Sequence, residues 1–155
     1  MQIMDFLNPK AISTDLKSSD KKGIIKELLD LLIGAGDIKA SDKNAFLDVI
    51  MEREALGSTG IGMGIGIPHG KSSNIQSLVA SFGISPKGVD FDSLDGEPAY
   101  IFFLLLAPQD TAGPHLKALA RISRLLKERY FRDALKKSVD LKEVLKIIKE
   151  EDQKK

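Results

Sequence analysis

Cysteine is absent from the 155-residue chain, and histidine occurs only at positions 69 and 115. The first absence excludes disulfides and thiolate metal sites, and the second disfavours a histidine-rich metal centre. We therefore expect no bound metal, and no motif calls for a cofactor. An excess of charge of one sign is also missing, because 23 basic and 22 acidic residues leave a formal net charge of +1. That balance provides no general attraction to nucleic acid or to anionic membranes.

Long hydrophobic runs are missing as well. No stretch of roughly 18 uncharged apolar residues is present, and the start MQIMDFLNPK lacks the basic beginning and long apolar centre of a signal peptide. We therefore expect a cytoplasmic protein without membrane insertion. The length fits a single domain over residues 1–155, and a domain of this size buries roughly 68–70% of its unfolded surface, enough for a full core.

Glycine, by contrast, is concentrated in one segment, GSTGIGMGIGIPHGK, from Gly57 to Lys71. Dense glycine marks backbone that turns sharply or comes close to something else, and the alternating isoleucines suggest short buried strands. Pro68 stiffens the chain before His69, and Gly70 frees it afterwards. The segment thus predicts a histidine on a tight turn at the end of a strand, although simple core packing with a structural histidine would leave the same pattern.

Phosphate-loop motifs do not explain this segment. A G-x-G-x-x-G match fails, because the third glycine would fall on Ile65, Ile67 or His69, and a Walker A loop would need glycine in place of Ile65. A histidine nucleophile or acid–base fits better, since neutral imidazole is reactive near pH 7 without a metal.

Before the glycine segment, hydrophobic spacing predicts two helices. An apolar piece, Ile3 to Leu7, is closed by Asn8-Pro9. The first helix is capped by Ser19 or Asp20 and stopped by Gly34 and Gly36, with a buried face of Ile24, Ile25, Leu28, Leu29 and Leu32. Ser41 caps the second, whose stripe is Phe46, Val49, Ile50 and Arg53. An arginine on a buried stripe calls for an anion, although it could also snorkel or form a structural ion pair.

After the glycine segment, two strands precede three helices. Leu78 to Ile84 reads as a strand, Pro86-Lys87-Gly88 as a turn, and AYIFFLLLA (Ala99 to Ala107) as a central strand buried on both faces. The next helix is capped by Thr111 or Gly113 and has Pro114 in its first turn, so that His115 sits at its start. Its expected stripe is Leu116, Leu119, Ala120, Ser123 and Leu126 or Lys127.

Two further helices complete the predicted chain. The first covers Arg129 to Lys136, with Tyr130, Phe131 and Leu135 facing inward. The second is capped by Asp140 and carries Leu141, Val144, Leu145 and Ile148, followed by a tail, EEDQKK, that should fray. The order of helices, strands and helices predicts an α/β fold, a single layered domain with a mixed β-sheet flanked by helices on both faces.

The combination of Arg53-Glu54, GSTGIG and IPHG resembles the active-site signature of a known family. The family is enzyme IIA of the bacterial phosphoenolpyruvate-dependent sugar phosphotransferase system, of the mannitol/fructose type that includes nitrogen-regulatory relatives. The resemblance extends over nearly the whole chain and implies the same layered fold. Two positions depart from the pattern: Met63 stands where the family often has a polar residue such as asparagine, and Gly66 where it often has alanine.

The resemblance implies roles for individual residues. His69 is the residue that would be phosphorylated, and Arg53 and His115 match an arginine and a second histidine of the family's site. From the residues alone, His115 would be a plain helix-start residue. The glycine-rich turn around Gly70 and the hydroxyls of Ser58 or Thr59 are candidates for binding the phosphoryl group.

Three classes of function remain open. The favoured one is a phosphocarrier, a phosphotransferase that accepts phosphoryl from the phosphocarrier protein HPr on His69 and passes it to an enzyme IIB partner for sugar uptake. The second is a nitrogen-type regulator whose phosphorylation state controls partner proteins. The third is a general-base hydrolase using His69 and His115, which is disfavoured because no orienting carboxylate lies in an identifiable motif.

Overall fold

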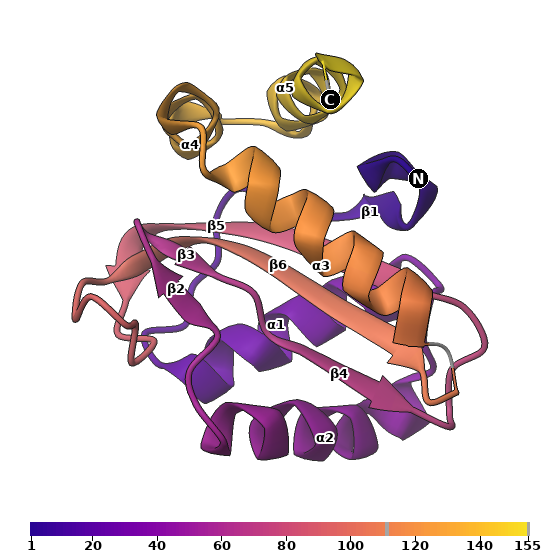
Figure 1. Ribbon diagram of the computed structural model, residues 1–155. Coiled ribbons are helices and arrows are strands. Elements are labelled where there is room, and N and C mark those ends of the chain that lie inside the picture. The colour runs from indigo at the N-terminus through magenta and orange to yellow at the C-terminus, as the bar shows by residue number, and fades with distance from the viewer. Residues whose placement is uncertain (111, 155) are drawn as a thin grey trace.

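A computed structural model describes residues 1–110 and 112–154, with Ala112 described by its backbone alone. The elements follow one another as shown in Figure 1: η1 (Ile3–Asp5), β1 (Leu7–Ser13), α1 (Lys21–Gly34), η2 (Ala40–Asp42), α2 (Lys43–Ala55), β2 (Gly60–Gly62), β3 (Ile65–Gly66), β4 (His69–Ser72), β5 (Val79–Val89), β6 (Ala99–Pro108), α3 (Ala112–Leu126), α4 (Arg129–Lys137) and α5 (Leu141–Lys154).

The strands of the described residues form one six-stranded mixed sheet in the order β1-β5-β6-β3-β2, with β4 also pairing with β6. β5 and β6 are antiparallel, whereas β1 runs parallel to β5, and β3 and β4 run parallel to β6. β6 therefore has β5 along one side and β3 and β4, end to end, along the other. The predicted central strand is confirmed, and it is the element against which the histidine-bearing strand is aligned.

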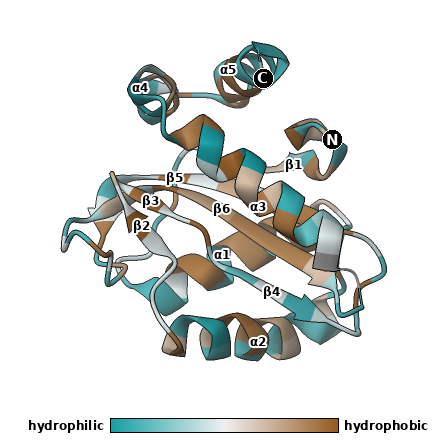
Figure 2. Cartoon of the chain, in the orientation of Figure 1, coloured by the Kyte–Doolittle hydropathy of each residue, from teal (hydrophilic) through white to brown (hydrophobic). Residues whose placement is uncertain are grey.

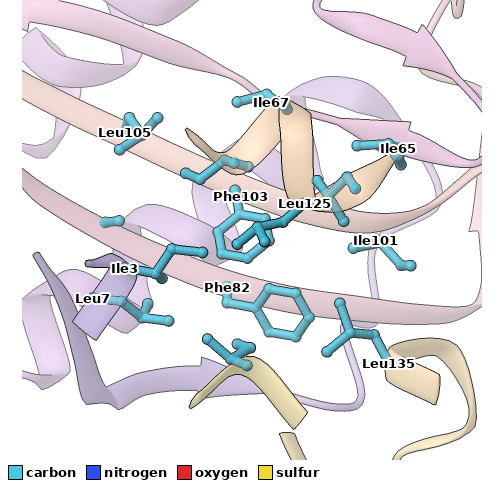
Figure 3. Packing of buried hydrophobic residues seen from close by; sticks show 14 of the residues in the cluster. Ile3, Leu7, Ile65, Ile67, Phe82, Ile101, Phe103, Leu105, Leu125 and Leu135 are labelled. Atoms are coloured by element: carbon cyan, nitrogen blue, oxygen red, sulfur yellow. The ribbon is translucent and has the colours of Figure 1, made fainter. Parts of the chain in front are cut away.

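Helices cover both faces of the sheet, as the sequence predicts. α1 and α2 lie on one face, and α3, α4 and α5 lie on the other (Figure 1). Successive residues of β6 alternate between the two cores: Phe103 packs with Phe82 on the three-helix side (Figure 3), and Phe102 packs with Phe91 on the two-helix side. This alternation explains why β6 is hydrophobic along its length in Figure 2.

Two stretches that the sequence assigned to turns lie within strands. The predicted end of the first apolar segment at Asn8-Pro9 is wrong, because β1 runs through both residues. Pro9 is tolerated because β1 is an edge strand that, among the described residues, pairs with β5 alone, and because the register of this pairing shifts between Leu7 and Ile12. The turn at Pro86-Lys87-Gly88 is also wrong. β5 continues to Val89 across a register shift that accommodates the proline.

The predicted buried face of α1 is confirmed, and two of the predicted helix caps are confirmed as well. Asp20 caps α1 by accepting from the Gly23 N–H at 2.8 Å, and Asp140 caps α5 by accepting from the Glu143 N–H at 2.9 Å. The Ser41 cap is wrong, since Ser41 lies inside η2 and α2 begins two residues later. Pro114 lies in the first turn of α3 as expected, while Thr111 falls outside the described residues.

The buried face of α3 differs from the prediction by about one residue position. Leu116 is 62% exposed and Ala120 is exposed, whereas the buried positions are His115, Ala118, Ile122, Leu125 and Leu126. Both patterns have helical spacing, so only the packing against the sheet decides between them. His115 consequently lies on the buried stripe.

The C-terminal helices hold further corrections. Tyr130 is 68% exposed and Leu141 42% exposed, whereas Phe131 and Leu135 are buried as expected. The tail does not fray within the described residues, because α5 continues to Lys154. Asp152 is buried there, where it accepts from the backbone N–H of Ile3 at 2.6 Å and from Nε of Arg121 at 2.5 Å.

Candidate active site

His69 is placed by an interruption in the strands beside β6. β3 ends at Gly66 and β4 begins at His69, and both pair with β6 in parallel, so that His69 lies opposite Leu105. The backbone N–H of Leu105 donates to the carbonyl of Pro68 at 3.0 Å, which fixes the connecting residue. The histidine therefore follows one strand, as predicted, but it is the first residue of the next rather than a residue beyond the sheet.

The His69 ring is oriented by its own backbone. Nδ1 lies 2.8 Å from the carbonyl oxygen of Ile67, which can only accept, so Nδ1 carries the proton and the neutral ring keeps its lone pair on Nε2. Burial lowers the pKa of His69 below its ordinary value, and the charge of Arg53 lowers it further, against the raising effects of the Ile67 hydrogen bond and of Glu54. Near pH 7 the ring is neutral and its nucleophilic nitrogen is defined.

His115 lies against His69. The two ring centroids are 5.4 Å apart with an interplanar angle of 59°. His115 is only 4% exposed, and its Nδ1 has no hydrogen-bond partner among the described residues. Burial, followed by the charges of His69 and Lys71, lowers the pKa of His115 to about 4. Burial and the neighbouring charges therefore keep the His115 ring neutral near pH 7.

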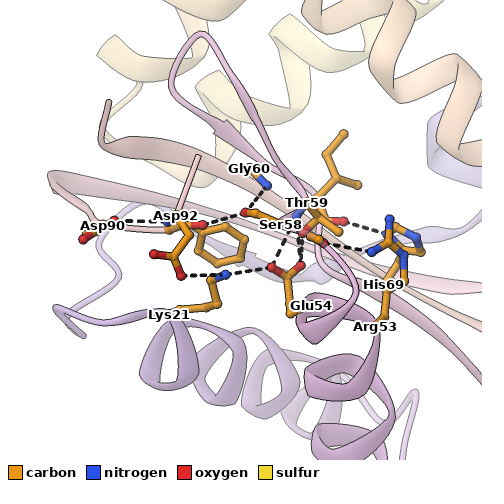
Figure 4. Close-up of polar contacts among 12 residues, drawn as sticks. Lys21, Arg53, Glu54, Ser58, Thr59, Gly60, His69, Asp90 and Asp92 are labelled. Atoms are coloured by element: carbon orange, nitrogen blue, oxygen red, sulfur yellow. Dashed lines mark hydrogen bonds and ion pairs between the residues drawn. The ribbon is translucent and has the colours of Figure 1, made fainter. Parts of the chain in front are cut away.

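Arg53 lies in the last turn of α2 at the border of its buried face. The buried residues of this helix are Phe46, Leu47, Ile50 and Glu54, so the predicted stripe is displaced and Arg53 is half-buried. One guanidinium nitrogen, Nη1, donates to the carbonyl oxygen of Gly57 at 2.9 Å (Figure 4). This bond satisfies a carbonyl at the C-terminal end of the helix, where a positive charge is favourable.

These three side chains meet at one pocket of about 320 Å³, which is lined by Val49, Arg53, His69, Gly70, Lys71, His115, Leu116 and Leu119. Apolar side chains form much of the wall, and none of the lining residues is acidic. A small anionic group fits such a surface, because the cations supply charge while the apolar wall limits competing water.

Gly70 allows this wall to form. A Cβ at position 70 would lie 2.7 Å from Cγ1 of Val49, closer than side chains can approach. The missing side chain therefore lets β4 pack directly against α2, which carries Arg53. Glycine is required here for close approach of two elements.

Ser58 and Thr59 are not brought to the pocket. The Ser58 hydroxyl donates to the carbonyl of Phe91 at 2.7 Å and accepts from the Gly60 N–H at 2.9 Å. The hydroxyl of Thr59, a buried residue, donates to Glu54 (Figure 4). Both hydroxyls thus bind protein groups away from the two histidines.

Lys71 lines the pocket, although sequence reasoning missed it. It follows His69 by two residues in β4, and residues two apart in a strand point to the same face. Alternation beginning at His69 would have identified it.

Among residues 1–110 and 112–154, no group of three or more His, Cys, Asp or Glu side chains is placed to hold a metal ion, and no helix is long and apolar enough to cross a membrane.

Comparison with known proteins supplies the context for this geometry. Residues 5–151 match the family model described as phosphoenolpyruvate-dependent sugar phosphotransferase system, EIIA 2. The chain is 36% identical over 148 residues to a nitrogen regulatory protein of Bradyrhizobium diazoefficiens, covering 96% of this chain and 95% of that one. It is 39% identical over 124 residues to the fructose-specific EIIA component of Haloferax volcanii, covering 80% and 79%.

Solved structures agree with this result. The nitrogen regulatory protein IIA-Ntr of Neisseria meningitidis superposes with a TM-score of 0.84 at 29% identity, covering 94% of this chain and 98% of that one. IIA mannitol of Escherichia coli, at 19% identity and a TM-score of 0.77, covers 91% and 97% and shares the fold. The match to residues 5–151 and the identities above 30% over most of the chain place this protein in the EIIA 2 family of the phosphoenolpyruvate-dependent sugar phosphotransferase system.

Proposed function

We propose that this phosphotransfer component accepts a phosphoryl group on Nε2 of His69. The observation that supports the proposal best is the hydrogen bond from Nδ1 to the Ile67 carbonyl, which leaves Nε2 with the lone pair beside a pocket without acidic side chains. In the step, a bond forms between Nε2 and phosphorus while the bond from phosphorus to the histidine nitrogen of phospho-HPr breaks. The departing imidazole takes the electron pair, and His69 keeps its proton on Nδ1.

Charge on the phosphoryl oxygens is the main requirement of this transfer, and the pocket offers three groups for it. Arg53 donates one hydrogen bond to the carbonyl of Gly57, and its planar guanidinium has further N–H groups that can donate to phosphoryl oxygens. His115, beside the His69 ring, also lines this pocket, and so does Gly70. Because the hydroxyls of Ser58 and Thr59 are bonded elsewhere, we assign phosphate binding to Arg53, His115 and Gly70.

The acceptor is an enzyme IIB partner in the favoured reading. The chain matches 98% of its own length to a fructose-specific EIIABC component of Bacillus subtilis but only 24% of that protein, so the acceptor domain there lies outside the match. The alternative is a nitrogen-type regulator, supported by the full-length match to the Bradyrhizobium protein. In both readings the donor is phospho-HPr, and the family supports a cytoplasmic site of action.

A hydrolase is a poorer fit to this geometry. General-base catalysis by a histidine usually relies on a third group that orients the base. Nδ1 of His69 is bonded to a backbone carbonyl, and Nδ1 of His115 has no partner within the described residues, so neither of these nitrogens is hydrogen-bonded to a carboxylate.

Purified protein incubated with phosphoenolpyruvate, enzyme I and HPr tests the proposal. We expect stoichiometric labelling that resists alkali and is lost in acid. A subsequent chase with a sugar-specific IIB should remove the label if the chain is a sugar phosphocarrier, whereas a regulator should retain it. Failure to take up label in the presence of phospho-HPr would exclude both readings.

A further inference from the structure

Glu54 is a buried carboxylate that the proposed transfer does not use. It is adjacent to Arg53 in the last turn of α2, and its side chain is 2% exposed. The C-terminal end of a helix disfavours negative charge, and burial of a carboxylate is costly unless it is paired and hydrogen-bonded. A carboxylate in this place depends on strong partners, and its partners are informative.

The partners of Glu54 come from a distant helix, α1, and from the segment just after α2 (Figure 4). Nζ of Lys21, in the first turn of α1, lies 3.0 Å from Oε1 of Glu54. The backbone N–H of Thr59 lies 3.2 Å from both carboxylate oxygens, and the Thr59 hydroxyl donates to Oε2. The carboxylate thus holds Thr59 through both its backbone and its side chain.

Thr59 is connected to the nucleophile through one intermediate residue. The carbonyl oxygen of Thr59 accepts from the Ile67 N–H at 3.0 Å, and the carbonyl oxygen of Ile67 accepts from Nδ1 of His69 at 2.8 Å. The hairpin of residues 60–66 between them is rich in glycine and contributes little stiffness of its own. The bond between Thr59 and Ile67 closes the base of this hairpin.

We propose that Glu54, held by Lys21, is a positioning residue for His69. By fixing Thr59 it orients the Ile67 peptide, whose carbonyl keeps the ring proton on Nδ1 and the lone pair on Nε2. The effect on transfer rests on the proposed function of His69, whereas the effect on the ring does not. Thr59 accordingly acts by positioning Ile67, which orients the His69 ring, and does not contact the phosphoryl group.

The charge of Glu54 also reaches the ring directly. Burial and Arg53 lower the pKa of His69, whereas Glu54 opposes them. Orientation of a histidine by the partner of its second nitrogen is a general device, and loss of such a partner in metal sites costs about 10–100-fold in activity or affinity. The same reasoning applies to an imidazole nucleophile.

Two variants test the inference. Glu54→Gln keeps the shape of the side chain and removes its charge. Thr59→Val removes the hydroxyl while retaining the backbone N–H and the volume. Asp152→Asn is the matched control, because the Asp152–Arg121 pair has side-chain exposures of 3% and 15%, close to the 2% and 14% of the Glu54–Lys21 pair. The partners of Asp152, Ile3 and Arg121, do not line the pocket of His69.

The readouts are the ¹⁵N resonances of the His69 ring and the kinetics of phosphoryl uptake from phospho-HPr. In the wild type and in Asp152→Asn we expect a single neutral tautomer with the proton on Nδ1. Glu54→Gln should show a mixture of tautomers and an uptake rate at saturation about tenfold lower, with KM within about twofold of wild type. Thr59→Val should change both in the same direction by a smaller factor.

Each outcome bears on the inference. Wild-type ring resonances in folded Glu54→Gln and Thr59→Val would overturn it, and so would a slower rate without a change of tautomer. If Glu54→Gln does not fold, Thr59→Val decides by the same readouts. A tautomer mixture in the variants, together with no phosphoryl uptake by the wild type, would support the positioning role and refute the proposed function.

Discussion

At the scale of single residues, His69 is constrained more tightly than its neighbours. Its ring is held by one hydrogen bond to Ile67 and by contact with His115, so a single nitrogen is free to react. We predict that phosphorylated protein carries its label on Nε2 of His69 alone, as read from phosphohistidine ³¹P and ¹⁵N shifts. His69→Ala should take up no label, and His115→Ala, which retains the nucleophile, is the control that should still do so.

His115 should change its protonation with the state of His69. In the free protein its pKa is lowered to about 4 by burial and by the charges of His69 and Lys71. A phosphoryl group on His69 adds about −1.5 to −2 charges nearby, which should raise the pKa of His115 and strengthen its hydrogen bond to the phosphoryl oxygens. NMR titration of the His115 ring before and after phosphorylation measures the change, and an unchanged pKa would remove His115 from the site.

The same residue makes folding sensitive to acid. Above pH 6.5 the ring is neutral in both folded and unfolded chains, whereas between 6.5 and about 4 only the unfolded chain takes up the proton. The contribution of His115 to the free energy of unfolding is therefore complete above pH 6.5 and is lost as the pH falls through that window. Urea unfolding of His115→Asn should show a shallower decline over the same range.

Arg53 has a structural partner, the Gly57 carbonyl, and a proposed transient partner, the phosphoryl group. Its bond to the Gly57 carbonyl contributes about 0.3–1 kcal/mol at the end of α2, so Arg53→Ala should remain folded. Transfer should fall much further than stability, and Arg53→Lys should recover only part of it because lysine lacks the planar fork. Parallel measurement of urea midpoints and uptake rates separates the two effects; unfolding of Arg53→Ala alongside full activity of Arg53→Lys would make it a structural ion pair.

The sequence was sufficient to single out His69, His115 and Arg53, which the structure brings to one pocket, because the glycine-rich segment and Pro-His-Gly together resemble one family. It was insufficient for Glu54, whose burial depends on Lys21, a residue 33 positions away in contact only after folding. Lys71 could have been found by strand alternation from His69, had β4 been assigned its register. Side-chain partners distant in sequence are therefore the part of the site that pattern reasoning could not supply.

At the scale of elements, the turn of the β2–β3 hairpin holds a non-glycine residue, Met63, in a strained left-handed conformation. Its two connecting residues, Met63 and Gly64, have φ values of +59° and +78°, the signs that a type I′ turn requires. Asn-Gly is the preferred pair for that turn, and a left-handed conformation costs most non-glycine residues about 1–2 kcal/mol. Met63, which stands where the family often has a polar residue such as asparagine, thus strains this turn.

Met63→Asn should raise the free energy of unfolding by about 1 kcal/mol, because asparagine tolerates the left-handed region and the backbone bond to Asp95 is retained. Met63→Ala is the control, since it removes the exposed side chain without relieving the strain. Equal midpoints for the two variants in urea would show that the turn conformation is not the cause.

The other departure, Gly66, has a steric reason. A Cβ there would lie 2.9 Å from two ring carbons of Phe102 and 3.3 Å from Phe91. The paired aromatic rings on the two-helix side leave no space for the alanine common in the family. Such a requirement could not be read from the sequence, because it depends on which face of β6 each phenylalanine occupies.

At the scale of the whole molecule, the two chain ends are fastened together. Asp152 in α5 accepts from the Ile3 backbone and from Arg121, which links η1, α3 and α5 on one face of the sheet. Asp152→Ala should lower the free energy of unfolding by about 3 kcal/mol, because it leaves a largely buried guanidinium and a backbone N–H without their partner. Glu150→Ala, on the exposed side of the same helix, should have little effect in the same thermal and urea unfolding measurements.

The contacts of Asp152 could not be predicted from the sequence, although most of the global fold could. The layered α/β domain, its central strand and its five α-helices followed from hydrophobic periodicity and capping residues. The ordered end of α5 did not, because EEDQKK reads as a solvated tail until Arg121 is brought beside it. β1 was missed for a related reason: its proline is tolerated only at a sheet edge, and the edge is a property of the assembled sheet.

The three residues of the site belong to three different layers. Arg53 comes from the helical layer on one face, His115 from the helical layer on the other, and His69 from the sheet between them. A protein partner that draws α3 slightly away from the sheet would withdraw His115 while leaving His69 and Arg53 in place. Control over the lifetime of a phosphoryl group would then require no movement of the atom that carries it.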